Sequence, residues 1–265
     1  MPTVCLRDKR VIERFFRNQA DLHVYSLGDL DDFFWPYTTW YALTVDQSPV
    51  AIALLYTGQA LPTLLALSEQ PAHMSELLES VVHLLPQDFN AHLSPGLEHI
   101  LQDRYELEPH GEHYKMALQD LSTIQGMQCE QAIRLSASDL HDITQLYAQS
   151  YPGNWFDPRM LATQQYFGIR QDNALVSIAG VHVYSETYRV AALGNITTHP
   201  AWRNKGLGAL VTARLCQSLS EHVDHVGLNV KADNRPAIAC YQKLGFRIIA
   251  SYGEFMVHMK RPSRL

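Results

Sequence analysis

The pattern of hydrophobic and polar residues is clearest between residues 190 and 246, where it alternates between two periods. Residues 190–198 are rich in small and β-branched side chains, and residues 225–230 are similar, so both segments are predicted to be buried strands. The stretch between them repeats at helical spacing. Its repeating positions are Leu207, Leu210, Val211, Arg214, Leu215, Ser218 and Leu219. A second, short helix is expected over residues 235–244, because Gly245 is a typical helix stop.

The segment before this core continues the alternation of strands and helices. The expected strands cover residues 132–135, 166–170 and 174–184. Ser138-Asp139 is a typical start for a helix that follows the first of these strands. Residues 151–158 then form a loop, which leads into a short helix near Met160.

The first half of the chain repeats this order of elements. A helix over residues 9–19 precedes a hairpin signal, in which residues 40–45 and 50–56 flank a polar turn. The remaining elements are a strand at 63–67, a helix at 72–85, a strand at 88–93, a short helix through Leu97 and Leu101, and two strands within 105–118 that meet near Gly111. A matching break is expected at Gly253. We therefore infer a degenerate second copy of one fold, with an unrelated α+β lid as the alternative.

This organisation predicts a domain over residues 1–125 and a second over residues 126–265, joined within a polar segment at 118–131. The predicted fold class is α/β (α+β). Each domain is expected to hold a mixed, mostly antiparallel central sheet flanked by helices.

Charge is distributed unevenly between the two halves. Residues 1–125 hold 7 basic and 17 acidic side chains, whereas residues 126–265 hold 14 and 10. Only the second half is therefore charged to suit a small polyanion, and the absence of basic tracts argues against nucleic acid. The longest apolar run, residues 50–56, is too short to span a bilayer, so no membrane partner is expected and the predicted location is cytoplasmic.

Other chemical signals are weak. The four cysteines are widely spaced, which is typical of reduced thiols. His110 and His113 lack a third partner at recognisable spacing, so no metal site is expected. The chain contains no Gly-x-Ser-x-Gly elbow of a serine hydrolase.

The strongest signal is the loop Arg203-Asn204-Lys205-Gly206-Leu207-Gly208, which lies between the first core strand and its helix. Glycines without a Cβ let the backbone approach a ligand closely, and the N-H groups of a helix N-terminus favour an anion. Arg203 and Lys205 add positive charge. The loop is therefore a candidate site for a phosphate or pyrophosphate.

The segment that follows specifies the ligand. Asn234, Ala237, Tyr241 and Gly245-Phe246 form an Asn-x-x-Ala-x-x-x-Tyr-x-x-x-Gly-Phe pattern. Together with the glycine loop, it resembles the acetyl-CoA core of the GCN5-related N-acetyltransferases (GNATs). The resemblance is strong over residues 130–260 and weak over the whole chain, where it extends to tandem glycine N-acyltransferase-like proteins. It implies the GNAT fold in both halves, but only the second half carries the CoA motifs, since residues 68–73 lack glycine, Lys and Arg.

The resemblance implies a set of acetyl-CoA contacts around the loop and the flanking strands. These expected contacts are Ile196, Thr197, Thr198, Arg203, Asn204, Lys205, Gly206, Leu207, Gly208, Ala209, Asn229, Asn234, Ala237 and Tyr241. The first three lie on a strand whose exposed backbone would pair with the pantetheine arm. Asn234 matches a pantetheine contact, for which a helix cap is the structural alternative.

Tyr241 matches the position from which a phenol protonates the departing thiolate, so it is the expected catalytic residue. The family's carboxylate base is missing, because Asn229 stands at one of its usual places and no acid lies between residues 189 and 200. His182, His199 and Glu186 are the nearest candidates, and ordered water is the alternative. The acceptor is expected to contact Tyr151, Trp155, Phe156, His182 and Tyr184.

The sequence thus predicts an enzyme that transfers the acetyl group of acetyl-CoA to a primary amine of a small molecule or amino acid. Direct transfer in a ternary complex is expected, because no side chain stands out as an acyl carrier. Two alternatives stay open: an N-acyltransferase that uses a larger acyl-CoA, and a CoA-binding module without catalysis. The sequence leaves the oligomeric state open, as a monomer or a homodimer.

Overall fold

The structure is a computed structural model that describes residues 1–260, and these residues form two compact units. The first unit comprises Met1–Lys115, Lys231–Asp233 and the described residues from Ala250 onward. The second comprises Met116–Val230 and Asn234–Ile249. The sequence places the boundary at residue 125, whereas residues 116–125 lie in the second unit and the described end of the chain lies in the first.

Two long strands explain this difference. Strands β6 (Tyr105–Leu118) and β12 (Phe246–Met259) each have 14 residues and contribute residues to both units. The breaks expected at Gly111 and Gly253 do not occur, although Gly111 has a φ of +101°. A glycine can adopt that angle inside a strand, so its presence does not require a turn.

The first unit is built on a mixed sheet with the strand order β1-β2-β3-β4-β5-β12-β6, of which β6 and β12 each contribute one part. Its strands are β1 (Thr3–Leu6), β2 (Thr38–Val45), β3 (Ser48–Tyr56), β4 (Thr63–Ala66), β5 (Asp88–Leu93) and these parts of β6 and β12. Strands β4 and β5 run parallel, whereas the pairs β1–β2, β2–β3, β3–β4 and β5–β12 are antiparallel. Parallel neighbours need a crossover connection, which helix α3 (Pro71–Val81) provides.

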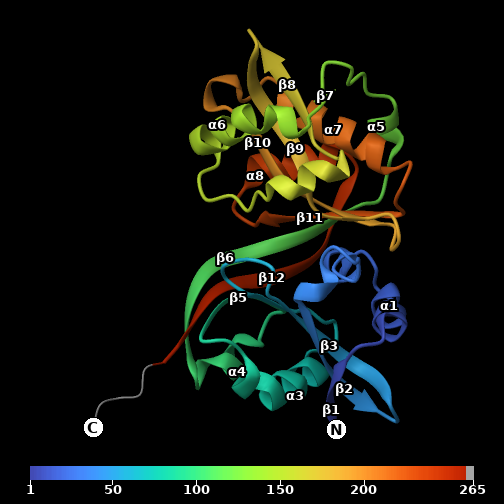
Figure 1. Cartoon of the computed structure of the whole chain (residues 1–265), viewed down its shortest axis with the longest axis vertical. Coiled ribbons are helices and arrows are strands. Elements are labelled where there is room, and N and C mark those ends of the chain that lie inside the picture. Colours follow the sequence, from blue (N-terminus) through green and yellow to red (C-terminus); the bar gives the residue numbers. More distant parts are fainter. Residues whose placement is uncertain (261–265) are drawn as a thin grey trace. The chain divides into compact units, whose positions relative to one another are not determined.

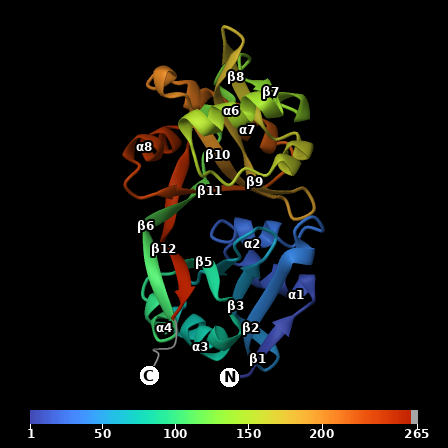
Figure 2. The ribbon, with the colours of Figure 1, turned by 60° about the vertical axis from the view of Figure 1, so that its left-hand side comes forward.

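Helices cover both faces of this sheet (Figure 2). Helix α1 (Lys9–Arg17) places Phe16 against Trp40, with a ring-centroid distance of 5.9 Å. Tyr41 and Leu43 point to the other face and join the core beneath α3 and α4 (Glu98–Gln102). The alternation of side chains along β2 therefore supplies two cores from one strand.

The second unit repeats this plan (Figure 1). Its strand order is β11-β10-β9-β8-β7, and only β10 and β11 run parallel. The strands are β7 (Ile133–Arg134), β8 (Phe167–Gln171), β9 (Ala174–Ser185), β10 (Val190–Thr198) and β11 (His225–Lys231). Helix α7 (Leu207–Leu219) makes the crossover, and α8 (Arg235–Lys243) follows β11. The predicted mixed, mostly antiparallel sheets flanked by helices are confirmed.

Several short elements were not expected from the pattern. They are β1, α2 (Val24–Gly28), α5 (Ser122–Gln125) and the 3-10 helices η1 (Trp35–Tyr37) and η5 (Pro200–Trp202). The 3-10 helix η2 (Val82–Leu84) forms the end of the helix expected over residues 72–85, and η3 (Ala137–Asp139) lies at the helix start expected from Ser138-Asp139. The short helix expected near Met160 is the 3-10 helix η4 (Pro158–Thr163). Elements of three to five residues are too short to establish a hydrophobic period, so they escape a reading based on periodicity.

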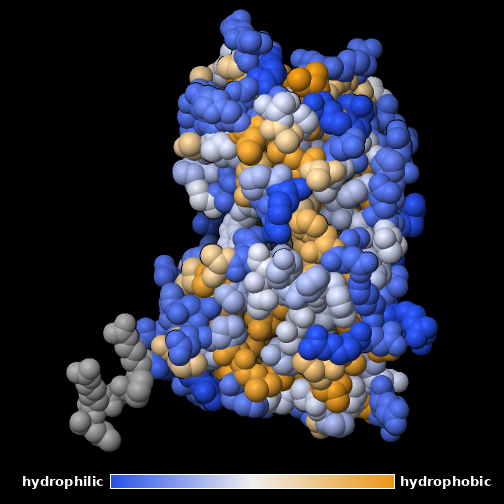
Figure 3. All heavy atoms as spheres, viewed as in Figure 1, coloured by the Kyte–Doolittle hydropathy of each residue, from blue (hydrophilic) through white to orange (hydrophobic). Residues whose placement is uncertain are grey.

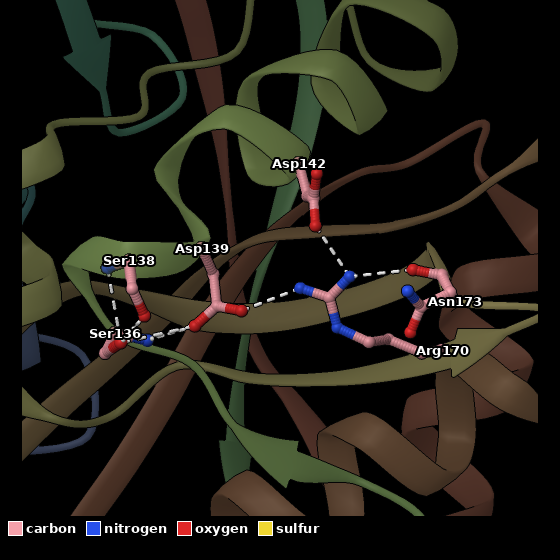
Figure 4. A network of polar contacts seen from close by, with 6 residues as sticks. All are labelled: Ser136, Ser138, Asp139, Asp142, Arg170 and Asn173. Carbon is pink, nitrogen blue, oxygen red and sulfur yellow. Dashed lines mark hydrogen bonds and ion pairs between the residues drawn. The ribbon is translucent and has the colours of Figure 1, made fainter.

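Helix α6 (Leu140–Ser150) is fixed at its N-terminal end by the polar network in Figure 4. Arg170 of β8 contacts the Asp139 and Asp142 carboxylates at 2.7 and 2.6 Å. Ser136 caps η3 (Ala137–Asp139), which directly precedes α6, and its N–H donates to the Asp139 carboxylate at 2.9 Å. Burial alone would raise the pKa of Asp139, but hydrogen bonds from Ser136 and Arg170 lower it overall.

The surface in Figure 3 is mostly hydrophilic, with hydrophobic side chains emerging as separate patches. Among the helices of residues 1–260, none has both the length and the apolar character that a membrane crossing needs.

Candidate active site

The site is organised around the place where β10 separates from β11. Their parallel pairing joins Val190–Leu193 to His225–Leu228 and ends there. The following residues of β10, Ile196, Thr197 and Thr198, are half-buried. Asn229, the first residue of β11 after the paired segment, is also half-buried. Two parallel strands that separate in this way present backbone N–H and C=O groups to a ligand that can act as an additional strand.

An irregularity in β10 marks the same place. Asn195 has a φ of +55°, and the register with β9 shifts between Gly194 and Thr197. The backbone O of Asn195 accepts a hydrogen bond from the Tyr147 hydroxyl at 2.9 Å, while its side-chain Nδ2 donates to the Tyr166 hydroxyl at 3.2 Å. The bulge therefore has its own buried hydrogen-bond partners.

The glycine loop follows directly from the end of β10. Gly206 is the N-cap of α7 with a φ of +78°, and no side chain in residues 1–260 caps this helix end. A Cβ added at Gly206 would meet no atom of residues 1–260 within 4 Å. Leu207 is buried, whereas Gly208 and Ala209 are half-buried in the first turn. The N–H groups of that turn have no acceptor within the helix, which makes them donors for an anion.

The basic residues of the loop differ in their contacts. Arg203 donates from Nε to the Thr198 carbonyl at 3.1 Å and from Nη2 to the Ser150 carbonyl at 3.4 Å, so it ties the loop to the end of β10 and to α6. Lys205 is exposed, and its Nζ lies 4.1 Å from the ring centroid of Trp202. Asn204 is exposed and has a φ of +62°.

Helix α8 carries the second motif. The Asn234 side chain is the N-cap and accepts the N–H of Ala237 at 3.3 Å, so the structure gives it a capping role. Tyr241 is buried, and its ring centroid lies 6.0 Å from that of Phe246. Burial raises the pKa of Tyr241 strongly, so its hydroxyl stays protonated at physiological pH.

The residues expected to contact the acceptor are only partly grouped. Phe156 packs between Tyr147 and Tyr166, with ring-centroid distances of 5.2 and 5.7 Å. Tyr151 and Trp155 of the same loop are exposed.

The other two expected acceptor contacts lie on β9. His182 is next to β10, because a Cβ on Gly194 would fall 1.2 Å from its Cδ2. Tyr184 donates to the Glu186 carboxylate at 2.5 Å.

Two of the three candidate bases have structural contacts. His199 Nδ1 accepts the Ala201 N–H at 3.3 Å as the N-cap of η5, and Glu186 accepts from Tyr184. Burial lowers the pKa of His182 to about 4, so this imidazole is neutral at physiological pH and is a weak base. Strand β10 contains no Asp or Glu, so it provides no carboxylate base.

Sequence reasoning missed the residues that support the bulge, namely Tyr147, Tyr166 and Ser150. Tyr147 and Tyr166 contact Asn195, which lies 48 and 29 residues later in the chain. Ser150 contacts Thr197, 47 residues later. A buried tyrosine needs a partner for its hydroxyl, and that requirement is the one signal that points to such contacts.

Comparison with known proteins identifies this unit. The model of the acetyltransferase (GNAT) family matches residues 140–246. Residues 140–246 form a GNAT family domain. This domain contains α6, the separated strands, the glycine loop and α8, so the family match coincides with the site. Members of this family transfer acyl groups from acyl-CoA, and the chain therefore carries an acetyltransferase-type domain. A search of curated protein sequences gives no match.

Solved structures extend the likeness beyond the GNAT domain. A Drosophila protein superimposes with a TM-score of 0.72 at 14% identity, covering 96% of this chain and 98% of its own. A tandem GNAT protein of the clavulanic acid biosynthesis pathway covers 99% of both chains at 15% identity, with a TM-score of 0.55. A GCN5-related N-acetyltransferase from Sphaerobacter thermophilus reaches 0.58 at 13% identity, covering 98% of this chain and 96% of its own. At these identities the likeness shows a shared tandem GNAT fold.

Proposed function

We propose that the second unit is an N-acetyltransferase that moves the acetyl group of acetyl-CoA to the primary amine of a small molecule or amino acid. The observation that carries this proposal is the combination of an open strand edge at residues 194–198 with an uncapped helix N-terminus at Gly206. The strand edge and the helix N-terminus follow each other along the chain. They suit two neighbouring parts of one extended ligand, the pantetheine arm and the pyrophosphate of CoA.

The glycine loop suits the pyrophosphate of CoA. The open space beside Gly206 and the N–H groups of residues 207–209 favour an anion at the positive end of the α7 dipole. Lys205 is exposed and adds a charge that can reach a phosphate oxygen. Arg203 shapes the loop through its two backbone contacts, and its remaining N–H groups can also face the anion.

The edge of β10 suits the pantetheine arm. Backbone groups of Ile196, Thr197 and Thr198 lie beyond the paired segment, so they can bond to amide groups of a ligand as a strand would. Backbone N–H groups at this edge can also polarise a thioester carbonyl, because fixed dipoles stabilise developing negative charge. Acetyl-CoA, when bound, supplies the thioester and its thiol leaving group.

Tyr241 is the proposed proton donor. In a direct transfer the amine nitrogen bonds to the acetyl carbon while the carbon–sulfur bond breaks, and the sulfur then takes a proton. The raised pKa keeps the Tyr241 phenol protonated and ready to donate. It also makes the phenol a weaker acid, so donation depends on close placement beside the sulfur.

Water is the proposed route for the amine proton. His182 is a weak base and the contacts of His199 and Glu186 are structural, so no side chain of the open edge is suited to this role. An α-amine has a pKa near 8, which leaves about a tenth of it neutral at pH 7 and makes a strong base unnecessary. An amino-acid-like or other weakly basic amine is therefore the favoured acceptor class.

The test is a panel of primary amines with acetyl-CoA and the full chain, in which thiol release and the mass of the product are followed. The proposal expects at least one amine to gain 42 Da, the mass of an acetyl group replacing a hydrogen, with thiol released in equal amount. Faster turnover with longer acyl-CoA would instead assign a larger acyl donor. Tight CoA binding without thiol release from any amine would contradict the enzymatic proposal.

A further inference from the structure

The Asn195 backbone is exceptional among the non-glycine residues with a positive φ within residues 1–260. The other non-glycine residues of this kind within residues 1–260 lie in turns, loops or helix ends, as Asp172 and Asn204 do, whereas Asn195 lies inside strand β10. Such a conformation costs about 1 kcal/mol or more and persists only where neighbouring groups hold it. Asparagine tolerates this region better than most residues.

The carbonyl groups around Asn195 are satisfied by tyrosine hydroxyls. Tyr147 of α6 donates to the Asn195 carbonyl at 2.9 Å, and Tyr166, just before β8, donates to the Val181 carbonyl at 2.8 Å. Each buried carbonyl needs a donor, and in a regular sheet a neighbouring strand supplies it. The tyrosine hydroxyls take over that role where the ladder of β10 is interrupted.

The Asn195 side chain completes this arrangement at a cost. Its Nδ2 donates to Tyr166, but its Oδ1 is buried without a hydrogen-bond partner among residues 1–260. An unsatisfied buried acceptor is destabilising, so fold stability alone does not favour this residue. A conformational role at the break in β10 explains its presence better.

We infer that Tyr147 and Asn195 are positioning residues that hold the break in β10 and so keep the backbone of residues 196–198 open for the acyl donor. The inference rests on the proposed function, because it explains how that CoA site is shaped. Neither side chain needs to touch the donor. Tyr147 acts through the carbonyl of Asn195, and Asn195 acts through its own backbone angle.

Phe156 connects the same group to the loop before η4. Its ring lies between the rings of Tyr147 and Tyr166, and burial raises the pKa of both tyrosines. Both hydroxyls therefore stay protonated, and their donation to backbone carbonyls does not change with physiological pH. The break should be a permanent feature of the unit.

The test compares Tyr147→Phe, Asn195→Ala and Asn195→Gly in the full chain, with CoA binding measured by calorimetry and KM for acetyl-CoA measured separately from kcat. Loss of one hydrogen bond predicts a CoA Kd raised about fivefold in Tyr147→Phe. Asn195→Ala should weaken CoA binding about tenfold, because alanine disfavours the positive φ. Asn195→Gly should bind CoA more tightly than Asn195→Ala, since glycine adopts that φ freely.

Tyr105→Phe is the matched control. Its buried hydroxyl donates to the Leu85 carbonyl at 3.2 Å in the first unit, so the same atom and the same kind of hydrogen bond are removed. This variant should lower the unfolding temperature as Tyr147→Phe does and leave CoA affinity unchanged.

The outcomes separate this inference from the proposed function. Wild-type protein that binds no CoA contradicts the proposed function itself. Wild-type protein that binds CoA, with Tyr147→Phe and Asn195→Ala binding it equally well, contradicts only the positioning role. Equal affinities of Asn195→Ala and Asn195→Gly also contradict it, because the backbone angle would then be irrelevant. Asn195→Ala could fail to fold, and in that case Tyr147→Phe against Tyr105→Phe decides the question.

Discussion

The two units share one order of elements, yet their parallel strand pairs end differently. In the first unit, the pairing of β4 with β5 continues as far as Ala66 and Leu93, and Ser94 then adds further hydrogen bonds. The Ser94 N–H donates to the Ala66 carbonyl at 3.1 Å, and the Ser94 hydroxyl accepts the N–H of Ser68 at 2.9 Å. In the second unit the pairing of β10 with β11 stops at Leu193. Ser94 therefore continues the contact between β4 and β5, whereas β10 and β11 separate.

The crossover helices differ in the same sense. Helix α3 begins after Gln70, whose φ is −113°, and has a proline in its first turn, which has no N–H to offer. Helix α7 begins at Gly206 with a φ of +78°. The comparison shows that a few residues at one strand end and one helix start decide whether this shared plan offers an open edge and an anion site.

The largest effect is expected from the proposed acid, which has no counterpart in the first unit, because α4 contains no tyrosine. Tyr241→Phe should lower kcat about 100-fold, the usual contribution of a positioned proton donor, and leave CoA affinity nearly unchanged. Steady-state kinetics with calorimetry would measure both. Tyr252→Phe, a buried tyrosine of the first unit, is the control and should keep kcat. Equal turnover of Tyr241→Phe and wild type, with transfer chemistry limiting, would remove Tyr241 as the acid.

A smaller effect is expected from the basic loop. Arg203→Ala with Lys205→Ala should weaken CoA binding about tenfold at low salt, and less at high salt, because exposed charges are screened. Calorimetry at two ionic strengths would measure this. Arg7→Ala with Arg104→Ala removes the same charge from exposed positions of the first unit and should leave CoA affinity the same. Equal losses in both double variants would mean that overall charge, and not the loop, matters.

The smallest effect on CoA is expected from the buried polar residues of the first unit. Lys115 is buried, its Nζ lies 4.8 Å from the Tyr25 ring centroid, and burial lowers its pKa to about 7. Between pH 7 and 10.5 the Lys115 side chain is therefore protonated in the unfolded chain but largely neutral in the folded one. This difference makes the free energy of unfolding rise with pH over that range, by at most about 1.4 kcal/mol per pH unit. Urea unfolding of Lys115→Met should lack this rise.

Lys115→Met should leave CoA binding unaffected, because Lys115 belongs to the first unit and the proposed CoA site to the second. A parallel pH dependence of stability in Lys115→Met and wild type would show that another group causes it.

Much of this fold could be read from the sequence, because long elements carry a clear period. The helix from Leu207 to Leu219 and the strands around it have a visible pattern, and the glycine loop shows its own chemistry. The pairing of Tyr147 with Asn195 could not be read, since it joins a helix to a strand 48 residues away. The assignment of β12 to both units also depends on long-range pairing, in which Val257 faces Phe89.

Calorimetric titration of the full chain with CoA tests the central claim most directly. We expect one CoA to bind per chain. Gly206→Val should greatly weaken that binding, because a β-branched residue is strained by about 1–3 kcal/mol at a φ of +78°. Two CoA molecules per chain, or a single one bound as tightly by Gly206→Val as by wild type, would contradict it.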